Sequence, residues 1–392
     1  MNTRIVKLGS VCTVVSGSTP KSEVDEYWDG DVKWITPAEL TEDSYIITDS
    51  VRHITSQAVH DTSLKPFPEG TVILSSRAPI GKTAIAGCEM YCNQGFKNLI
   101  CSPQIDPKYL YCFLSGKTEY LNSLGRGATF KEISKSIVES IEIPLPELAV
   151  QRQISLQFEH IRALIRQYRK QLHYLDQLVK SRFIEMFGLP GTDTFGWGLV
   201  PLGSVCLVNP KKSQDSRLVA NLSVSFVPMP AVTEHGEIDA TEMRTYDEVK
   251  TGFTYFAEND VLFAKITPCM ENGKGAVARG LHNGIGFGST EFHVLRPLKG
   301  VSDPRWIYTL TIFPQFRNDA ANNMTGSAGQ RRVPASFLES YRVAVPPIDL
   351  QEQFAAFVTQ TDKSKFSLKN GGKDADFAVK CIWESLCRGT LT

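Results

Sequence analysis

Residues 6–14 read VKLGSVCTV and residues 200–208 read VPLGSVCLV, and seven of these nine positions are identical at an offset of 194 residues. Further identical pairs follow in the same order along the chain, at offsets between 189 and 200 residues. They include Phe67 and Phe256, Glu69 and Glu258, Asp106 and Asp303, Tyr111 and Tyr308, Ala128 and Ala328, Glu139 and Glu339, and Gln151 and Gln351. Because chance similarity would not keep this order, the matches predict two related domains.

A long helix is predicted at the end of the first repeat, after Pro144 and Pro146 and before Gly188. Apolar side chains recur there at alternating spacings of four and three residues, which is the seam pattern of a coiled coil. The predicted seam residues are Ile154, Phe158, Ile161, Ile165, Tyr168, Leu172, Leu175, Val179 and Met186, with Arg182 interrupting the series. About 40 residues make a rod of roughly 60 Å, which needs a partner to cover its stripe. An ordinary amphipathic helix packed on one domain is the alternative.

The partner helix is predicted at the end of the second repeat, from about Leu350 onward, antiparallel to the first. Its seam is less regular, because Gly371-Gly372 stands in the middle of it. A glycine pair inside a helix costs on the order of 2 kcal/mol, so we expect a kink or a break there. The positions with seam spacing before and after the pair are Phe354, Val358, Thr361, Lys365, Leu368, Val379, Ile382 and Leu386.

The rest of each repeat has the pattern of alternating strands and helices. Helices are expected just after Asp106-Pro107 and Asp303-Pro304. Strands are expected at VKWIT (32–36), TVILSS (71–76), TAIAG (83–87), DVLFAKI (260–266), GAVARG (275–280) and EFHVL (291–295). The predicted fold class is α/β (mixed α+β), with two similar globular domains joined by two long antiparallel coiled-coil helices as a pseudo-two-fold internal repeat. The expected segments are domains at 1–146 and 189–346 and helices at 147–188 and 347–392.

Composition is that of a globular protein, with 42% hydrophobic and 21% charged residues. The formal net charge is zero, which argues against a nonspecific basic nucleic-acid coat and leaves room for local basic patches. Nine scattered cysteines predict free thiols in a reducing compartment, and Cys88 and Cys92 have no paired CxxC that would make a zinc site. No apolar run reaches the roughly 18–20 residues of a membrane span, and no secretory signal is visible. The expected location is cytoplasmic.

Motifs for nucleotide chemistry are incomplete. Residues 75–85, SSRAPIGKTAI, end like a P-loop, but Ser76 stands where the first glycine belongs and Pro79 removes an N–H donor. The second repeat has Gly-Lys-Gly at the equivalent place, so a structural hairpin is the better interpretation. The run GIGFG at 284–288 is interpreted as a turn, because a dinucleotide fingerprint follows one strand and opens a helix. We therefore expect no catalytic residue, no metal and no cofactor in this chain.

Two basic, glycine-rich segments stand at equivalent places in the two repeats, GRGATFKEI at 125–133 and GSAGQRRVP at 326–334. Glycine lets the backbone approach phosphates closely, and Arg or Lys can then reach a phosphate or a base edge. Any one of these residues alone fits an ordinary solvated surface residue, but their recurrence in both repeats favours a function. The candidates for DNA binding, in these segments and the neighbouring hairpins, are Arg77, Lys82, Arg126, Lys131, Lys265, Lys274, Gln330, Arg331 and Arg332.

These features together resemble the specificity subunit of type I restriction-modification enzymes, over essentially the whole chain. The likeness is carried by the two LGSV openings, the two P…QxQ junctions at 146–153 and 346–353, DPKYLYCFL, GRGATFKEIS and the heptad helix ending in RFIEMFG. The resemblance implies that each repeat is a target-recognition domain followed by a conserved spacer helix. It implies that each domain reads one half of a bipartite asymmetric site in double-stranded DNA, at a spacing that the coiled coil sets.

The resemblance also implies partners. Two modification (methyltransferase) subunits would dock on the helical frame, and restriction (translocase/nuclease) subunits would join them. Catalysis would then lie outside this chain, with S-adenosylmethionine, ATP and magnesium all belonging to partner subunits. The alternative is a non-DNA-binding scaffold or inhibitor that occupies modification subunits; such a protein would keep the helices and lose the basic loops.

Overall fold

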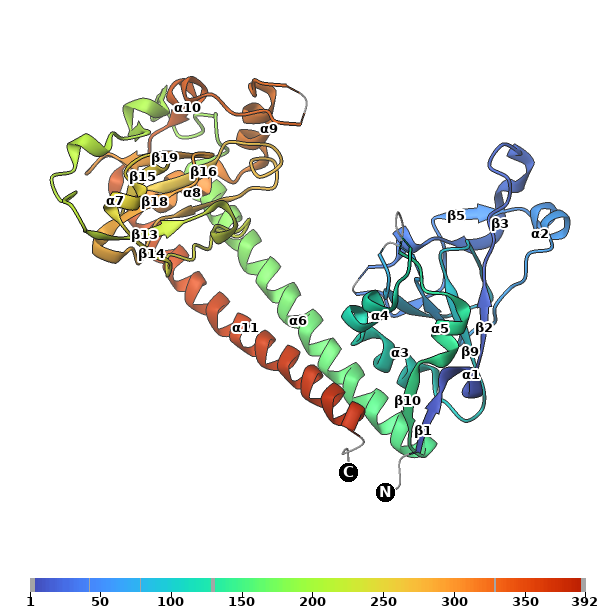
Figure 1. Ribbon diagram of the computed structural model, residues 1–392. Coiled ribbons are helices and arrows are strands. Elements are labelled where there is room, and N and C mark those ends of the chain that lie inside the picture. Colours follow the sequence, from blue (N-terminus) through green and yellow to red (C-terminus); the bar gives the residue numbers. More distant parts are fainter. Residues whose placement is uncertain (1–3, 42, 78, 128–130, 328, 389–392) are drawn as a thin grey trace. The chain divides into compact units, whose positions relative to one another are not determined.

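The computed structural model describes residues 4–41, 43–77, 79–127, 131–327 and 329–388 (Figure 1). By its internal contacts the chain divides into two units. The first unit comprises residues 1–169 and 370–392, and the second comprises residues 170–369. Each unit therefore holds one repeat together with parts of two long helices, α6 (Leu148–Phe187) and α11 (Ile348–Arg388).

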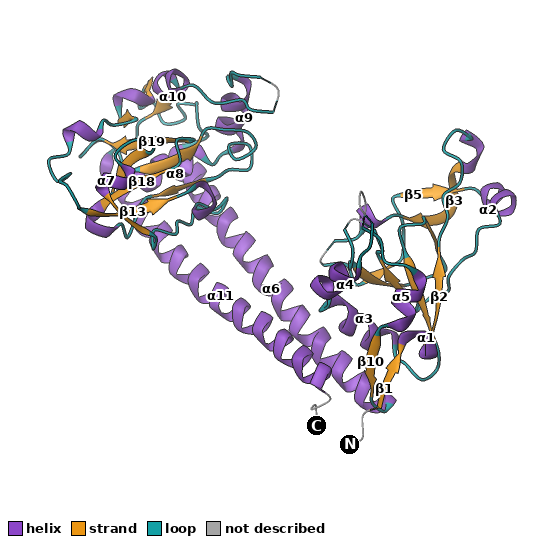
Figure 2. Ribbon diagram, in the orientation of Figure 1, coloured by secondary structure: helices purple, strands orange, loops and turns teal. Residues whose placement is uncertain are grey.

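In the first unit, the described strands form three sheets, which Figure 2 shows in orange. The largest has the strand order β2-β9-β6-β7-β4, a smaller one has the order β5-β3-β8, and β1 pairs with β10. The strands are β1 (Arg4–Lys7), β2 (Cys12–Ser16), β3 (Trp28–Ile35), β4 (Ile46–Ile47), β5 (Arg52–Ile54), β6 (Val72–Leu74), β7 (Thr83–Ala86), β8 (Tyr91–Cys92), β9 (Lys97–Cys101) and β10 (Glu142–Leu145). The short helices are α1 (Leu8–Val11), α2 (Ser56–Thr62), α3 (Pro107–Ser115), α4 (Thr118–Leu124) and α5 (Lys135–Ser140).

The second unit repeats most of this topology, without a counterpart of β4 and with β15 added to the smaller sheet. Its described strands form sheets of order β12-β19-β16-β17 and β14-β13-β18-β15, and β11 pairs with β20. The strands are β11 (Leu199–Pro201), β12 (Cys206–Val208), β13 (Ser223–Val227), β14 (Met243–Thr245), β15 (Thr254–Ala257), β16 (Val261–Ala264), β17 (Gly275–Val277), β18 (Ile285–Gly288), β19 (Phe292–Pro297) and β20 (Arg342–Ala344). The short helices are α7 (Tyr246–Val249), α8 (Pro304–Thr311), α9 (Pro314–Asn322) and α10 (Ala335–Ser340). The mixed α/β class and the internal repeat are thus confirmed.

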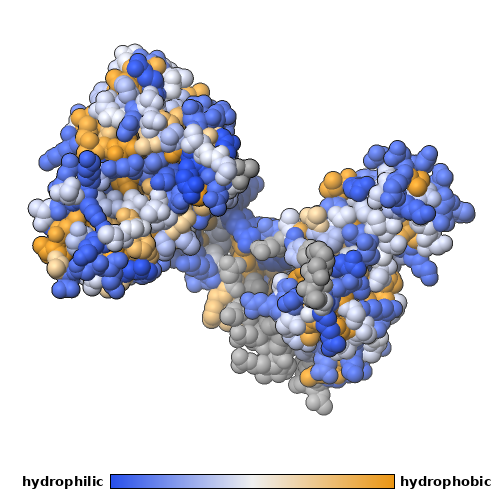
Figure 3. Space-filling model, turned by 45° about the horizontal axis from the view of Figure 1, so that its top comes forward, coloured by the Kyte–Doolittle hydropathy of each residue, from blue (hydrophilic) through white to orange (hydrophobic). Residues whose placement is uncertain are grey.

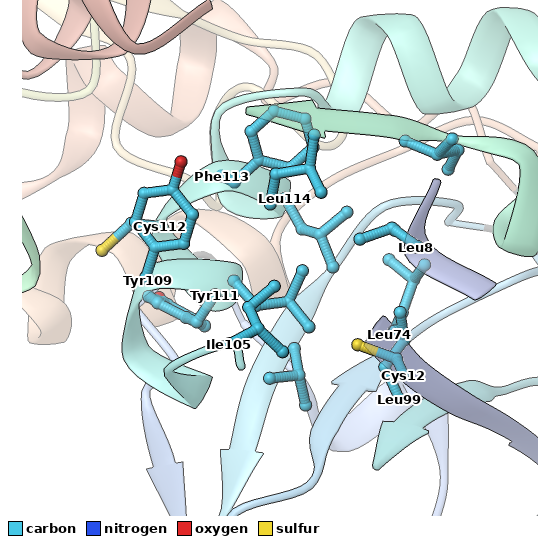
Figure 4. Packing of buried hydrophobic residues seen from close by; sticks show 14 of the residues in the cluster. Leu8, Cys12, Leu74, Leu99, Ile105, Tyr109, Tyr111, Cys112, Phe113 and Leu114 are labelled. Carbon is cyan, nitrogen blue, oxygen red and sulfur yellow. The ribbon is translucent and has the colours of Figure 1, made fainter. Parts of the chain in front are cut away.

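Equivalent residues start equivalent helices in the two units. The carboxylate of Asp106 accepts hydrogen bonds from the N–H groups of the second and third residues of α3, and Asp303 does the same for α8. Proline follows each aspartate, and it suits the first helical position because the N–H there needs no intrahelical partner. The six residues Tyr109 to Leu114 of α3 are buried, and Figure 4 shows several of them in the core with Leu8, Leu74 and Leu99. The predicted helices after Asp-Pro are therefore confirmed.

The hairpin interpretation of the P-loop-like stretch is also confirmed. Strands β6 and β7 pair antiparallel, from Val72 opposite Ile85 to Leu74 opposite Thr83. Gly81-Lys82-Thr83 leads into strand β7, whereas a P-loop leads into a helix. The GIGFG run, however, is not a turn: its last four residues are strand β18, and the prediction was wrong. A Cβ on Gly286 would lie 2.1 Å from the ring of Phe256, so glycine is needed there to let the ring lie across the strand.

Helix α6 begins in the core of the first unit and ends in the core of the second, and α11 begins in the core of the second. In the first unit, Ile154 and Phe158 of α6 belong to the main hydrophobic core. In the second unit, Val179, Phe183 and Phe187 of α6 share a core with Phe354 and Val358 of α11. The seam predicted between these ends, namely Ile161, Ile165, Tyr168, Leu172 and Leu175, is half-buried. Near its end the predicted seam was interrupted at Arg182 and resumed at Met186, which is half-buried, whereas the buried side chains there are Phe183 and Phe187.

The two helices contact each other in both units, and in the second unit they run in opposite directions. In the first unit Tyr168 lies beside Gly371, and in the second unit Lys365 Nζ lies 2.6 Å from Asp176 Oδ1. In the second unit Phe354 of α11 also packs on Phe183 and Phe187 of α6, so the number rises along α6 while it falls along α11, which is antiparallel pairing. Helix α11 runs through Gly371-Gly372 without interruption, so the expected break was wrong. A Cβ on Gly371 would lie 3.1 Å from the Tyr168 ring, so the glycine gives this ring room on the facing helix.

Surface character is mixed. On the face drawn in Figure 3, hydrophilic residues predominate, with hydrophobic ones scattered among them. Of the helices in the described ranges, none has the length and apolar character that crossing a membrane requires. A group of three or more metal-ligating side chains is likewise not found among the described residues. The side chains at Val379, Ile382 and Leu386, three of the predicted seam positions in α11, lie outside the described part of the structure.

Candidate nucleic-acid interface

The first glycine-rich loop is tied to the end of the β6–β7 hairpin. The backbones of Arg126 and Glu132 exchange two hydrogen bonds of 3.0 and 2.9 Å, and Ile133 N–H donates to Ser76 O at 3.0 Å. Gly127 has φ +132°, a value that only glycine adopts readily. The tip of the loop, residues 128–130, lies outside the described residues. The loop is therefore anchored at its base, with Arg126 and Lys131 exposed beside it.

A carboxylate between two cations fixes this base. Glu132 accepts from Arg77 Nε at 2.8 Å and from Lys97 Nζ at 3.0 Å. Burial alone would raise the pKa of Glu132, but Lys97 and Arg77 outweigh it and lower that pKa below its usual value. Lys97 itself is 7% exposed. Arg77, a candidate for DNA contact, is thus engaged in holding the loop.

The second glycine-rich loop has the same backbone plan. Thr325 and Arg332 exchange hydrogen bonds of 2.9 and 2.8 Å, and Val333 N–H donates to Lys265 O at 2.9 Å. Gly326 has φ +122°, matching Gly127 of the first loop. Ala328 lies outside the described residues. By these bonds Arg332 occupies the place that Glu132 occupies in the first unit.

The charges at this place are reversed between the two units. Arg332 donates to both carboxylate oxygens of Glu291, at 2.8 Å from Nη2 and 3.0 Å from Nε. This pairing with Arg332 is the main reason that the pKa of Glu291 lies below its usual value. An acidic residue on the first loop and a basic residue on the second are each neutralised by the strand beneath. Two loops of one backbone design therefore carry opposite charges at their bases.

Several other candidates for DNA contact also have partners within the chain. Arg331 Nη2 donates to the carbonyls of Ala321 and Met324, at 2.9 and 3.1 Å, and so covers the end of α9. The ammonium of Lys82 donates to Leu40 O. Burial lowers the pKa of Lys265. Arg331 and Lys82 therefore hold the scaffold, and contact of these three residues with DNA stays a prediction.

The remaining candidates are more accessible. Arg126, Lys131 and Gln330 are exposed, and Lys274 is half-buried. Among the described residues, no side-chain hydrogen bond or ion pair is found for these four. Their side chains are therefore available to a phosphate or a base edge, and this too stays a prediction.

A second pair of arginines, which the sequence patterns did not single out, lies on the small sheets. Arg52 on edge strand β5 stacks over the ring of Trp28, 3.8 Å from its centroid. Arg244 on edge strand β14 stacks over Phe226 at 3.5 Å and pairs with Glu242 at 2.8 Å. Such stacking orients a guanidinium and leaves N–H groups at its rim for another acceptor. A comparison of the two repeats could have found them. Arg52 and Arg244 are 192 residues apart, and so are the aromatic residues Trp34 and Phe226.

Comparison with known proteins gives these loops their context. A family model described as "Type I restriction modification DNA specificity domain" matches residues 2–173 and again residues 196–375. The type I restriction enzyme MjaIX specificity subunit of Methanocaldococcus jannaschii is 39% identical over 186 residues, which cover 47% of this chain and 43% of that protein. The EcoAI specificity subunit of Escherichia coli is 39% identical over 168 residues, which cover 42% of this chain and 28% of that protein. The matched segments thus span less than half the length of these relatives.

Solved structures share the fold over nearly the whole chain. A chain from work on complex assembly and conformational transition of the type I R-M system has a TM-score of 0.59 at 17% identity, covering 99% of this chain and 98% of that one. The S subunit of a type I restriction-modification system from M. genitalium has a TM-score of 0.53 at 14% identity, covering 98% and 96%. With the family model matched once in each repeat, the chain belongs to the type I restriction-modification DNA specificity family and carries two copies of its domain.

Proposed function

We propose that this chain is the DNA-recognition subunit of a type I restriction-modification complex. Each repeat would read one half of a bipartite site in double-stranded DNA. The observation that carries the proposal is the double match to a DNA specificity domain, one copy in each structural repeat. The double match also weighs against the rival interpretation, a scaffold that binds no DNA.

The two half-sites should differ in sequence. The loops have one backbone plan, yet the exposed Arg126 of the first loop corresponds, by its backbone bonds, to Thr325 in the second. Likewise Arg52 lies over an indole and Arg244 over a phenyl ring. Because base edges are read by the donors and acceptors at a few positions, these differences support an asymmetric target.

The paired helices would hold the two domains at a set spacing and receive two modification subunits. Large apolar side chains are exposed along them, and such side chains on paired helices suit a protein partner. They are Leu156, Leu164, Tyr174, Leu178 and Ile184 on α6 and Phe366 and Phe377 on α11, each at least 41% exposed. The curated relatives are named as subunits, which fits a surface that awaits a partner.

The chemistry would then belong to those partners. The modification subunits would use S-adenosylmethionine, and restriction subunits would use ATP and magnesium. This chain would supply no catalytic group and would act in the cytoplasm, where the DNA is. The family match supports this division, and the assay below tests it through the site that becomes methylated.

The chain is co-expressed with its modification subunit in a host that has no adenine methylation of its own. Genome-wide mapping of adenine methylation is then the test. We expect new methylation at a motif made of two unlike parts separated by a fixed gap. Omission of the chain should abolish it. A variant with Arg126→Ala and Lys131→Ala should methylate the same motif more weakly, because two exposed cations beside the first loop are lost. A continuous motif, or no new methylation, would contradict the proposal.

A further inference from the structure

Each recognition domain is clamped to the start of its own long helix by a buried glutamine. Gln151 Oε1 accepts from Asp106 N–H at 2.8 Å, and its Nε2 donates to the carbonyls of Gln104 and Pro146 at 3.0 and 2.8 Å. Gln351 makes the same three bonds in the second unit, with Asp303 N–H at 2.9 Å and the carbonyls of Val301 and Pro346 at 3.0 and 2.8 Å. Both glutamines are fully buried.

Apolar side chains extend this inner attachment by about two turns. Ile154 and Phe158 are 3% exposed in the first unit, and Phe354 and Val358 are 0% and 9% exposed in the second. These four residues occupy equivalent positions, each 200 residues apart. The inner joint is therefore the same in both units. Burial of these apolar side chains is the main source of the stability of the joint.

A second attachment lies farther along each helix. Arg169 Nη1 on α6 pairs with Asp43 Oδ1 at 2.6 Å, and Lys369 on α11 pairs with Glu237. Arg169 and Lys369 are again 200 residues apart, and each stands 18 residues beyond its clamping glutamine. At about 1.5 Å per residue, the inner and outer attachments are roughly 27 Å apart on the helix. Two contacts at that separation resist rocking of a domain on its helix.

Between the two attachments lies a polar contact whose chemistry differs between the units. In the first unit Arg162 donates to the hydroxyl of Tyr111, and its guanidinium lies 5.1 Å from that ring. At the equivalent place in the second unit Asp362 pairs with Arg305 at 2.6 Å. The helix residues Arg162 and Asp362 are equivalent, whereas their partners are not: Arg305 corresponds to Lys108, which pairs with Glu159 at 2.7 Å in the first unit.

We propose that Arg169 with Asp43, and Lys369 with Glu237, are equivalent outer latches that fix the tilt of each recognition domain on its own helix and so narrow the range of DNA spacers that the protein accepts. The inference rests on the proposed function. The latches are positioning residues, since they act through the orientation of the domains. A domain without its outer latch, held by the inner joint and the contact at Arg162 or Asp362, would rock more and reach half-sites one base pair nearer or farther.

Because the latches are exposed, their effect on the orientation of the domains can be measured apart from any effect on the stability of the chain. The side chains of Arg169 and Asp43 are 55% and 59% exposed, and those of Lys369 and Glu237 are 33% and 52% exposed. Ion pairs so exposed contribute little to folding free energy. Their loss should therefore leave the thermal unfolding midpoint unchanged and alter the lengths of DNA spacer that are methylated.

The experiment compares the intact chain with the variant Arg169→Gln/Lys369→Gln, each co-expressed with the modification subunit. Methylation is counted at genomic sites that carry both half-sites with the preferred gap and with gaps one base pair shorter or longer. We expect methylation at the off-length gaps to rise at least tenfold relative to the preferred gap. Half-site sequences and the thermal unfolding midpoint should stay unchanged. A change in off-length methylation of less than twofold would overturn the proposal.

A charge-swap variant serves as the rescue. Arg169→Asp with Asp43→Arg, combined with Lys369→Glu and Glu237→Lys, rebuilds both pairs with reversed polarity and should restore spacer choice. Failure of this rescue would refute the latch role.

The matched control is Lys135→Gln/Lys250→Gln. It also removes one cation from an exposed pair in each unit, with Glu139 at 3.6 Å and Asp247 at 2.9 Å, but the partners of these pairs are only four and three residues apart in the sequence. We expect this control to methylate the same gap lengths as the intact chain. A range of methylated gap lengths as broad as that of the latch variant would contradict the proposal. If the intact chain itself directs no bipartite methylation, the proposed function fails; if it does and the latch variant keeps its spacer, only the latch inference fails.

Discussion

Single side chains attach each domain to its long helix and each glycine-rich loop to its domain, and their partners lie far away in the sequence. Gln151 was visible in the repeat because Gln351 matches it, but its bonding partners Gln104 and Asp106 are 47 and 45 residues away. The pairing of Arg332 with Glu291 spans 41 residues. Sequence patterns could therefore name the positions that recur, and they could not tell which basic residues of the loops have partners. Such long-range pairs follow from the packing of strands, which no local pattern encodes.

Replacing Gln151 with leucine should destabilise the first unit by about 2–4 kcal/mol. The substitution leaves three partly buried backbone groups without this partner, and such a group costs about 1–3 kcal/mol when it is fully buried, part of which the apolar side chain offsets. Urea unfolding of the purified chain measures the change. The second glutamine of the same junction, Gln153, is exposed, so Gln153→Leu is the matched control and should be close to neutral. Equal losses for both variants would refute the clamp.

The Glu291–Arg332 pair predicts a pH dependence of stability. The pKa of Glu291 is lowered in the folded chain from an ordinary value near 4.5, so the unfolded chain binds its proton more tightly. The stabilisation is fully present above pH about 4.5 and is lost as pH falls through the folded pKa. The unfolding midpoint of Glu291→Gln should therefore lie below that of the intact chain at pH 7, and the gap should close toward low pH. The exposed Glu271→Gln is the control, and a gap that does not depend on pH would contradict the assignment.

At the scale of elements, the hydrophobic period predicted α6 well and local propensity misjudged α11. The bounds of α6 fall within one residue of the predicted helix, because a long regular seam with proline before it and glycine after it leaves little choice. The glycine pair in α11 was expected to break the helix, since propensity counts only the local cost. Pairing of the helices offsets that cost, with Tyr168 of α6 beside Gly371. In the same way GIGFG was interpreted as a turn, although its glycines serve close packing inside a strand.

Alanine substitutions at the glycine pair should have different effects. Glycine costs about 1 kcal/mol relative to alanine inside a helix. At Gly372 a Cβ would meet its nearest atom, Tyr168 Cβ, at 4.0 Å, so Gly372→Ala should stabilise the chain by up to about 1 kcal/mol. At Gly371 a Cβ would come to 3.1 Å from the Tyr168 ring, so Gly371→Ala should gain clearly less or lose stability. Urea unfolding of both variants tests this; equal gains would show that Tyr168 does not need the space.

At the scale of the whole molecule, the ordered repeat was the feature from which the fold class and the family were predicted. The fold class and the family could both be predicted from residues spaced by about 194 positions, because a duplicated chain repeats its framework and varies its loops. The contacts that join each domain to its helix could not be predicted, since they depend on side chains brought together only by the fold. The proposed function requires that this framework set the distance between the two halves of a DNA site.

The most direct measurement of that requirement is the spacer preferred by a lengthened chain. Seven residues with seam spacing are inserted between Lys170 and Gln171 of α6 and between Lys369 and Asn370 of α11, which keeps the seam in register and adds about 10 Å. Methylation mapping should then show the same two half-sites with a gap longer by about three base pairs, at about 3.4 Å per pair. An unchanged gap in a chain that still methylates its half-sites would contradict the account.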